Sequence, residues 1–438
     1  MQYDQFWLDP GNVSLPWLAL LYSVMTIAAT IYRRSEDPLP RELGDPRDVE
    51  GIFLRRTAQC LAQSNYTLPG KYKFEALLLH ALGEFFTSED VKVGVSHILS
   101  ITARLAIQMG YHRDPRHYSD ISVFDGEMRR RSWACVTQLD TIISFQVGLP
   151  KTIQDWQFDT ELPQNLLDED FSPDCERLPP ARSDNERTAL SYTRSKSRIV
   201  SVFGRITDVA YSRTPVTYEE TLEMDRQLEE THDLIPSFLK MKPIQQSYAD
   251  SSELIMRRYS LEFLYQKARC VLHRPYLAEA RSNLRYTYSH WVCISAAKEV
   301  LRHQVDIHQE SQPGGQIYRD QILVNSIQNT DYLGATAILC LELFYDQTLG
   351  PSGPSGAGND PDDLLATLEM SHRILEKARW RSKDSQKAYT VLSAMLQRVK
   401  GDKPDMAQLE QTVPQFESVF TGNSIDPALL DLGMMFPN

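Results

Sequence analysis

Residues 74–110 read FEALLLHALGEFFTSEDVKVGVSHILSITARLAIQMG, and their apolar side chains recur with a helical period. Counting from Phe74, apolar residues stand at i, i+3, i+4, i+7, i+8 and i+11, which is the pattern of one buried helix face. In the second half they recur every three or four residues from Val91 to Met109. Gly110 then stands where a helix-ending glycine is favoured. The stretch therefore predicts two amphipathic α-helices.

The same periodicity continues on both sides of this stretch, with loops rich in glycine, proline or acidic residues between the runs. The further expected helices are 17–32, 48–64, 126–147, 186–212, 216–232, 251–281, 287–307, 318–346, 361–380 and 384–399. We find no run of alternating β-branched residues and no glycine-rich phosphate-binding loop in the sequence. We therefore expect a large, multi-helical all-α fold of about ten to thirteen helices.

Composition shifts suggest how the chain is organised. The expected parts are a main body at 1–345 that begins with an extended lead-in at 1–14, a flexible Gly/Pro/Ser-rich loop at 346–361, C-terminal helices at 362–400 and a tail at 401–438. An acidic connection at 151–185 interrupts the main body, and it is either an internal boundary or an irregular arm lying on the core. The tail holds an acidic-hydrophobic segment at 424–436, which either packs on the domain or contacts an activator.

Charge and cysteine content exclude several classes of protein. The 46 basic residues against 58 acidic ones give a net charge of −12, which repels bare DNA, so any DNA contact needs a local basic patch or another segment. The six cysteines include no C-x2-C pair, which excludes a disulfide scaffold, a local zinc cluster and a redox pair. Most lie among apolar neighbours, which indicates buried thiols in a reducing compartment.

One uncharged segment, Leu15–Tyr32, raises the question of a membrane. Its 18 residues just reach the lower limit for a span. Pro16 and three hydroxyl residues dilute its apolarity, and Asp4 and Asp9 stand where a signal peptide would be basic. We interpret the segment as a fully buried core helix, with a membrane anchor or a signal as the alternative, and expect no membrane partner.

The densest polar group lies between Arg104 and Gly148. Its candidate residues are Arg104, Gly110, His112, Arg113, Asp114, Glu127, Arg129, Arg130, Arg131, Trp133, Asp140 and Gly148. Three consecutive arginines sweep about 200° of a helix, so at least one must approach the apolar stripe and needs a carboxylate there. Acids are interleaved with the arginines, which favours an internal ion-pair network that ties two antiparallel helices together. The alternative is a patch that binds anions or DNA phosphates.

Other patterns give little support for catalysis or metal binding. His112 and His117 are five residues apart across Pro115, which is not the spacing of a helical metal pair. The stretches DPDDLL at 360–365 and LLDED at 166–170 superficially resemble the magnesium motifs of all-α terpene cyclases, but no second motif stands at the needed spacing. No G-x-S-x-G is present. We expect no catalytic, metal or cofactor residues and no enzyme activity, with a terpene-cyclase-like all-α enzyme as the alternative.

Two neighbouring stretches also resemble a known family. ITARLAIQMGYHRDP at 101–115 and FDGEMRRRSWACVTQLDTIISFQVGLP at 124–150 resemble the signature of the fungal-specific transcription factor domain. This domain is the middle homology region of the fungal Zn2Cys6 regulators. LHRPY at 272–276 is similar to a further family feature. The chain departs from the family pattern at Tyr111, where leucine is usual, and at Leu149, where arginine is usual.

The resemblance implies a regulatory domain that controls RNA polymerase II transcription in the nucleus and carries no catalytic residues. Family members usually begin with a six-cysteine cluster that binds two zinc ions, and the 438 residues contain no such cluster. We therefore expect zinc and DNA contact to come only from a segment outside this chain or from a partner. The alternative is a co-regulator that acts through protein contacts alone. Further expected partners are the transcription machinery or co-regulators, a second copy of the chain, and a small-molecule effector whose binding shifts the exposure of other segments.

Overall fold

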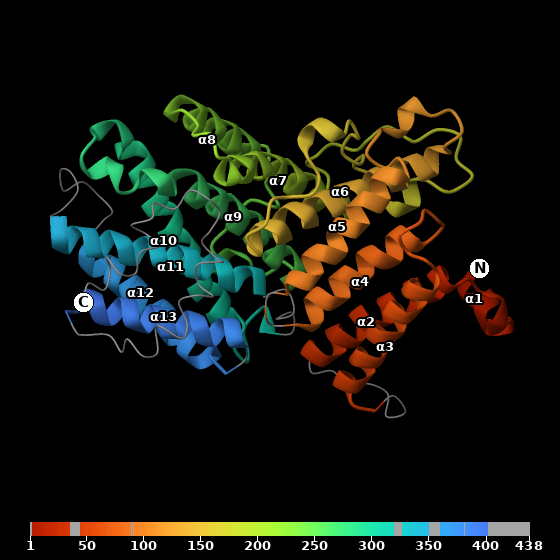
Figure 1. The fold of residues 1–438 in the computed structure, drawn as a ribbon, viewed down its shortest axis with the longest axis horizontal. Coiled ribbons are helices and arrows are strands. Elements are labelled where there is room, and N and C mark those ends of the chain that lie inside the picture. Colours follow the sequence, from red (N-terminus) through yellow and green to blue (C-terminus); the bar gives the residue numbers. More distant parts are fainter. Residues whose placement is uncertain are drawn as a thin grey trace.

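A computed structural model of the chain describes residues 2–35, 44–88, 90, 92–318, 326–349, 360–380 and 382–401. Within these ranges the chain forms thirteen α-helices joined by turns and short 3-10 segments, and it contains no β-strand (Figure 1). The prediction of an all-α fold is confirmed. The helices are α1 (Gln2–Leu8), α2 (Leu15–Ser35), α3 (Pro46–Gln63), α4 (Lys73–Thr87), α5 (Val93–Gln108), α6 (Val123–Gln146), α7 (Leu190–Tyr211), α8 (Tyr218–Asp233), α9 (Ser252–His273), α10 (Thr287–Glu310), α11 (Ser326–Leu349), α12 (Pro361–Ala378) and α13 (Lys383–Val399).

Several predicted boundaries are wrong; α11, for example, ends at Leu349 instead of at 346. Residues 2–8 form the short helix α1, although 1–14 was expected to be extended. Helix α9 ends at His273 instead of continuing to 281, and Arg274–Tyr276 form a 3-10 turn. Pro275 explains this end, because proline has no N–H to continue the helical hydrogen bonds. The expected loop at 346–361 and the tail segment at 424–436 lie largely or wholly outside the described residues.

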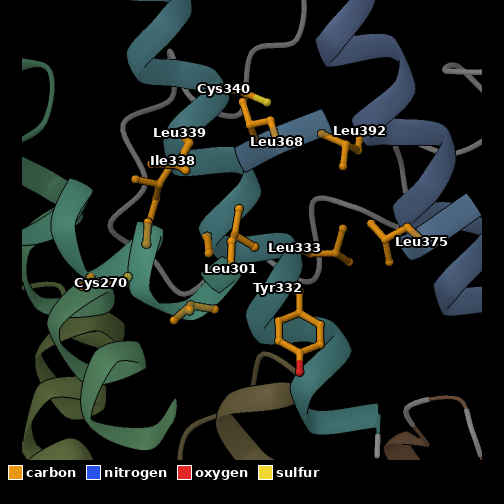
Figure 2. Close-up of a cluster of buried hydrophobic side chains, with 14 of the residues drawn as sticks. Cys270, Leu301, Tyr332, Leu333, Ile338, Leu339, Cys340, Leu368, Leu375 and Leu392 are labelled. Carbon is orange, nitrogen blue, oxygen red and sulfur yellow. The ribbon is translucent and has the colours of Figure 1, made fainter. Parts of the chain in front are cut away.

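The helices surround three buried apolar clusters that follow one another along the molecule. Helices α2 to α6 build the first, α6 to α9 the second, and α9 to α13 the third. Figure 1 shows α2–α6 at one end of the molecule and α10–α13 at the other, with α9 between them. Figure 2 shows Leu301 of α10, Leu339 of α11 and Leu368 of α12 among the buried side chains of the third cluster. Helices α12 and α13 thus share a core with α10 and α11.

Helix α9 is the central helix of this arrangement. Seventeen of its 22 residues are buried, including charged ones, so it is surrounded by other elements on nearly every side. The Lys267 ammonium lies 2.5 Å from a carboxylate oxygen of Asp331 on α11, and the two side chains are only 7% and 5% exposed. Each of these charges would be costly to bury alone, so the pair holds α9 and α11 in one register.

The prediction that residues 15–32 form a fully buried core helix is wrong, because helix α2 has an exposed side. Val24 and Ile31 are 50% and 46% exposed. Among the described residues, α2 is the one helix long and apolar enough to cross a membrane by length and composition. The apolar stretch is Leu15–Arg33, its mean hydropathy is 1.6, and 28% of it is buried. The exposed apolar side of α2 is therefore the main difference between the structure and the predicted core.

We predict that Asp331→Ala lowers the free energy of unfolding by about 3 to 5 kcal/mol, because it leaves the Lys267 ammonium buried without a counter-charge. The measurement is urea unfolding followed by far-UV circular dichroism. The matched control is Glu223→Ala, which breaks an ion pair with Arg226 at the surface (N–O distance 2.5 Å) and should change little. Equal losses for the two variants would contradict the assigned role of the buried pair.

Candidate functional site

The candidate residues of the sequence motif gather where α5 turns into α6. Gly110 has a φ of +78°, and the Tyr111 N–H donates to the Ala106 carbonyl (3.0 Å), which closes the end of α5. Gly148, with a φ of +73°, closes α6 in the same way. Both positions need the left-handed conformation that glycine adopts without strain. The two glycines therefore fix where the chain leaves each helix.

Asp114 is the centre of the network and is fully buried. Arg130 of α6 binds it with two hydrogen bonds, Nε to Oδ2 at 2.9 Å and Nη2 to Oδ1 at 2.7 Å. The backbone N–H groups of Arg116 and Glu161 also donate to the carboxylate, at 3.1 and 3.0 Å. A two-pronged arginine contact of this kind is the strongest type of charged hydrogen bond. One carboxylate thereby joins α6, the turn before it and a segment 47 residues further along the chain.

These contacts decide the ionisation of Asp114. Burial opposes the charged form, but the hydrogen bonds from Arg130 and from the Glu161 and Arg116 amides outweigh it. The pKa of Asp114 therefore lies well below its usual range.

Glu127 forms a second, weaker centre one turn before Arg131. Its Oε1 lies 3.4 Å from Arg131 Nε and accepts the Gln164 N–H at 3.1 Å. Burial raises the pKa of Glu127, although the Gln164 amide and Arg131 partly oppose this. Arg131 also donates to Asp168 in the acidic connection (2.7 Å). The connection at 151–185 is thus bound to α6 by charged contacts.

Two candidate residues have other partners than predicted. Arg129 contacts no acid in the described structure and instead lies over the Tyr111 ring (5.1 Å) and near the Met109 carbonyl (3.5 Å). Asp140 does not meet an arginine, because its Oδ2 accepts the backbone N–H of Ile153 at 2.8 Å. Burial raises the pKa of Asp140. The network of arginines and acids therefore includes Arg130 and Arg131 but not Arg129 or Asp140.

The remaining candidates lie around the edge of the network. Arg104 is exposed on α5, and Arg113 forms a half-exposed ion pair with Asp159 (3.0 Å). The His112 carbonyl accepts the Asp159 N–H at 3.0 Å. Trp133 is 2% exposed and packs edge-to-face against Phe158, with ring centroids 5.5 Å apart. These contacts again join the motif to the segment that follows α6.

Together the motif residues hold one irregular segment, 151–164, which we call the strap. Asp140 binds it at Ile153, Asp114 at Glu161 and Glu127 at Gln164. The Thr160 hydroxyl adds a bond to the Tyr111 carbonyl (2.7 Å). An irregular segment must satisfy its backbone polar groups outside regular structure, and here the motif's carboxylates do this. Of the two alternatives for the acidic connection, the strap behaves as an arm lying on the core.

A cavity of about 540 Å³ lies between the strap and the helices α6 and α7, with the end of α8 at its rim. Its apolar lining includes Trp133 and Val200 from the helices and Ile153 and Phe158 from the strap. Its polar lining includes Thr137 and several other hydroxyl groups. The volume falls within the range of small-molecule pockets. The strap that the motif holds is therefore one wall of a cavity.

Each charged side chain that lines the cavity has a partner of opposite sign. Lys151, whose side chain is 3% exposed, lies 2.7 Å from Asp155 and 3.1 Å from Asp208. A Cβ at Gly204 would stand 3.0 Å from the Lys151 nitrogen, so glycine makes room for the ammonium. Arg198 pairs with Asp184 (2.6 Å), and Glu161 pairs with Arg116. The lining thus combines neutral hydrogen-bonding groups with aromatic and aliphatic surface.

The LHRPY stretch serves the core. His273 lies between Asp225 (Nε2 to Oδ1, 3.1 Å) and Ser289 (Nδ1 to Oγ, 2.8 Å). His273 and Ser289 are completely buried, so this group resembles a catalytic triad in composition but is closed to any substrate. It joins α8, α9 and α10 as a buried polar network.

The alternative metal and enzyme motifs have structural partners. His117 hydrogen-bonds Asp159 (3.0 Å). Asp170 of the LLDED stretch pairs with Arg182 (2.7 Å), and Asp363 of DPDDLL pairs with Lys298 (2.5 Å). In the part of the chain that the structure describes, no group of three or more His, Cys, Asp or Glu side chains is placed to hold a metal ion.

Comparison with known proteins identifies the family. The sequence model of the fungal specific transcription factor domain matches residues 3–235, which include the whole motif, the strap and the cavity. The chain belongs to this family. The family and the relatives are transcription factors, not enzymes. No solved structure matches the chain significantly.

Three curated fungal relatives match nearly the whole chain. The Zn(2)-C6 fungal-type transcription factor pigI of Monascus ruber is 36% identical over 97% of this chain and 53% of its own length. The Zn(2)-C6 fungal-type transcription factor mpsB of Macrophomina phaseolina is 35% identical, over 91% of this chain and 54% of its own. The equisetin cluster transcription factor eqxF of Fusarium heterosporum is 33% identical, over 93% and 59%. The chain therefore spans little more than half the length of these relatives.

Sequence reasoning missed the cavity and the residues from α7 that line it. The cavity forms only when the strap folds back over α6 and α7, and no periodic pattern marks that contact. The i, i+4 spacing of Lys151 and Asp155 was one local signal of a buried lysine with a partner.

We predict that Asp114→Asn lowers the free energy of unfolding by about 3 kcal/mol at neutral pH, since Arg130 then loses its hydrogen-bonded carboxylate and keeps only Glu127, at 3.9 Å. Urea unfolding measures the loss. The matched control is Asp168→Asn, which also removes a carboxylate that pairs with an arginine, here Arg131. The Asp168 side chain is 76% exposed, so water replaces the lost contact. The control should change stability little. A loss at Asp168 as large as that at Asp114 would contradict the proposed centre.

The low pKa of Asp114 also predicts a pH dependence. A carboxyl whose folded pKa is depressed contributes stability that is complete above its unfolded value, near 3.8, and is lost as the pH falls toward the folded pKa. Between about pH 4 and pH 2, the wild type should therefore lose more stability than Asp114→Asn. Parallel losses in acid unfolding curves would show that Asp114 is not the group responsible.

Proposed function

We propose that this chain is the regulatory domain of a fungal transcription factor that acts in the nucleus on a gene cluster, and that its cavity receives a small neutral molecule that controls it. Family membership supports the role in transcription. The name of the equisetin cluster transcription factor, similar over 93% of this chain, supports control of a cluster.

DNA contact is proposed to come from a zinc cluster outside these 438 residues. The two relatives named Zn(2)-C6 are nearly twice as long as the part that this chain matches. The net charge of −12 opposes direct contact with phosphates. In addition, the three consecutive arginines of the motif, 129–131, are held by the Tyr111 ring, Asp114 and Glu127 and are not arranged as an open basic patch.

The observation that carries the effector role is the link between the cavity and the family motif. Glu161 lines the cavity, and its backbone N–H binds Asp114. Ile153 lines the cavity and binds Asp140. A ligand that fills the cavity must contact the strap, so occupancy would favour the conformation in which the motif holds it. The balanced charges of the lining favour a neutral ligand with both apolar and hydrogen-bonding groups.

The role in transcription is tested by fusing the chain to a heterologous DNA-binding domain in a fungal reporter strain. We expect the fusion to change reporter output by about threefold or more relative to the DNA-binding domain alone, and the isolated chain to leave duplex DNA unbound at physiological salt. Tight, salt-sensitive binding of DNA by the isolated chain would contradict the proposal, as would an inert fusion.

The cavity is tested with the neutral solvatochromic dye Nile red as the probe. Thr137 lines the cavity, and its hydroxyl bonds only carbonyls of its own helix, at Trp133 and Ala134. Thr137→Phe fills the cavity and should weaken dye binding about tenfold, whereas Thr137→Ala removes the same hydroxyl and should leave binding unchanged. Fluorescence titration measures the difference. Equal affinities for the two variants would show that the cavity does not take up the dye.

A further inference from the structure

Most polar side chains that line the cavity are bound within the protein. The Thr137 hydroxyl donates to the Trp133 carbonyl at 2.9 Å, and the Thr160 hydroxyl donates to the Tyr111 carbonyl at 2.7 Å. The charged side chains of the lining form the ion pairs described above. A ligand gains new hydrogen bonds only from groups that still lack a partner, so these groups determine which chemistry the cavity selects.

Thr141 of α6 lines the cavity, is 7% exposed and carries a hydroxyl without a partner in the described structure. A threonine in a helix usually donates its hydroxyl to the carbonyl three or four residues before it. The other buried threonines of the described helices do so, namely Thr26, Thr30, Thr57, Thr102, Thr207, Thr221 and Thr336. The Thr141 hydroxyl is also not among the unpartnered side-chain atoms that the fold seals off. It therefore faces the open space that the residue lines, which is the cavity.

Gln138 lies three residues before Thr141 on the same face of α6 and is also 7% exposed. Its Nε2 donates to the Thr193 carbonyl of α7 at 3.0 Å and to the Ser197 hydroxyl oxygen at 2.6 Å. A carbonyl can only accept, so the contact with Thr193 determines which end of the side-chain amide is the nitrogen. Both N–H bonds of the amide are then used, whereas Oε1 accepts no hydrogen bond in the described structure and is not sealed off. Oε1 is therefore an open acceptor on the cavity wall.

These two side chains require one donor and one acceptor from a ligand. Gln138 Oε1 can only accept, and the Thr141 hydroxyl has a proton free to donate. Residues three positions apart on a helix are neighbours, with Cβ atoms about 5–6 Å apart. A ligand that carries an N–H and a carbonyl on adjacent atoms can therefore contact both side chains at once.

We infer that the cavity recognises a lactam, whose N–H donates to Gln138 Oε1 and whose carbonyl accepts the Thr141 hydroxyl. This inference rests on the proposed uptake of a small neutral molecule and adds the chemical class of that molecule. The lactam ring holds the N–H and the carbonyl on the same side of the amide. An open-chain secondary amide is trans and points them to opposite sides, so it reaches only one of the two groups.

Other polar groups of similar size fit the pair less well. A carboxylate has no proton to donate to Gln138 Oε1. A single hydroxyl oxygen would have to lie within about 2.8 Å of both side-chain oxygens, whereas a lactam places its donor and its acceptor on separate atoms. The remainder of the ligand would contact Trp133, Ile153, Phe158 and Val200, which favours an aromatic or aliphatic body.

The lactam contact also connects the ligand to α7. Oε1 and Nε2 of Gln138 belong to one amide, so a donor at Oε1 polarises the group and strengthens its donation to the Thr193 carbonyl. The same molecule lies against the strap at Ile153 and Phe158. Occupancy therefore tightens the contact between α6 and α7 while it supports the strap on the opposite wall.

The first experiment changes the ligand, because Gln138 also binds α7 and its substitution would disturb the fold. The full chain is titrated with phenanthridinone, a neutral fluorescent lactam, and with N-methylphenanthridinone, which lacks the N–H. We expect the N-methyl compound to bind about tenfold more weakly or worse, since it leaves Oε1 without a donor. Phenanthrol, which offers one hydroxyl on a similar ring system, should also bind more weakly. Equal affinity for phenanthridinone and either of these compounds would overturn the inference.

The second experiment changes the hydroxyl. Thr141→Val has nearly the same shape and should weaken phenanthridinone binding about fivefold or more, with unchanged urea unfolding because the hydroxyl binds nothing in the free protein. The matched control is Thr137→Val, which removes a hydroxyl of the same cavity that is bound to its own helix. It should leave the affinity unchanged. Full affinity in Thr141→Val, or an equal loss in both variants, would overturn the assigned contact.

Nile red distinguishes a failure of this inference from a failure of the proposed function. If the wild type binds Nile red but not phenanthridinone, the cavity takes up neutral molecules without the lactam contact, and only this inference is overturned. If the wild type binds neither compound, the proposed uptake is overturned together with it. Binding of both, with the preference for the N–H lactam and the loss in Thr141→Val, is the result that we expect.

Discussion

The contact between Asp114 and Arg130 determines how the centre of this molecule is closed. The carboxylate is fully buried, and burial is tolerated because an arginine and two backbone amides bind it. One of these amides belongs to Glu161, which lines the cavity. The family motif therefore acts as a clamp on the strap. Arg130 of α6 binds Asp114, and Asp114 binds the strap, which forms one wall of the cavity.

Periodicity and local chemistry predicted the helices and the ends of α5 and α6. Gly110 and Gly148 could be placed because a helix-ending glycine needs only local information. The interleaved charges indicated that arginines near 130 meet acids, and Arg130 and Arg131 do so. The domain boundaries and the functional role of the motif residues remain predictions.

Other features depend on contacts that no local pattern records. Asp140 binds the backbone N–H of Ile153, which lies 13 residues further along the chain and beyond the end of α6. Helical spacing therefore could not predict this partner. Helix α2 was expected to be buried because it is apolar, but hydropathy does not say which face packs inward. Its hydroxyl groups turn toward α3 and α4 because small residues allow close approach there, and this leaves Val24 and Ile31 outside.

The central claim is that the motif's carboxylates hold the strap, and amide hydrogen exchange tests it most directly. In Asp114→Asn, the Glu161 amide should exchange about tenfold faster or more than in the wild type, while amides in the middle of α9 keep their protection. Unchanged exchange at Glu161 would contradict the account, because the strap would then be held without the clamp.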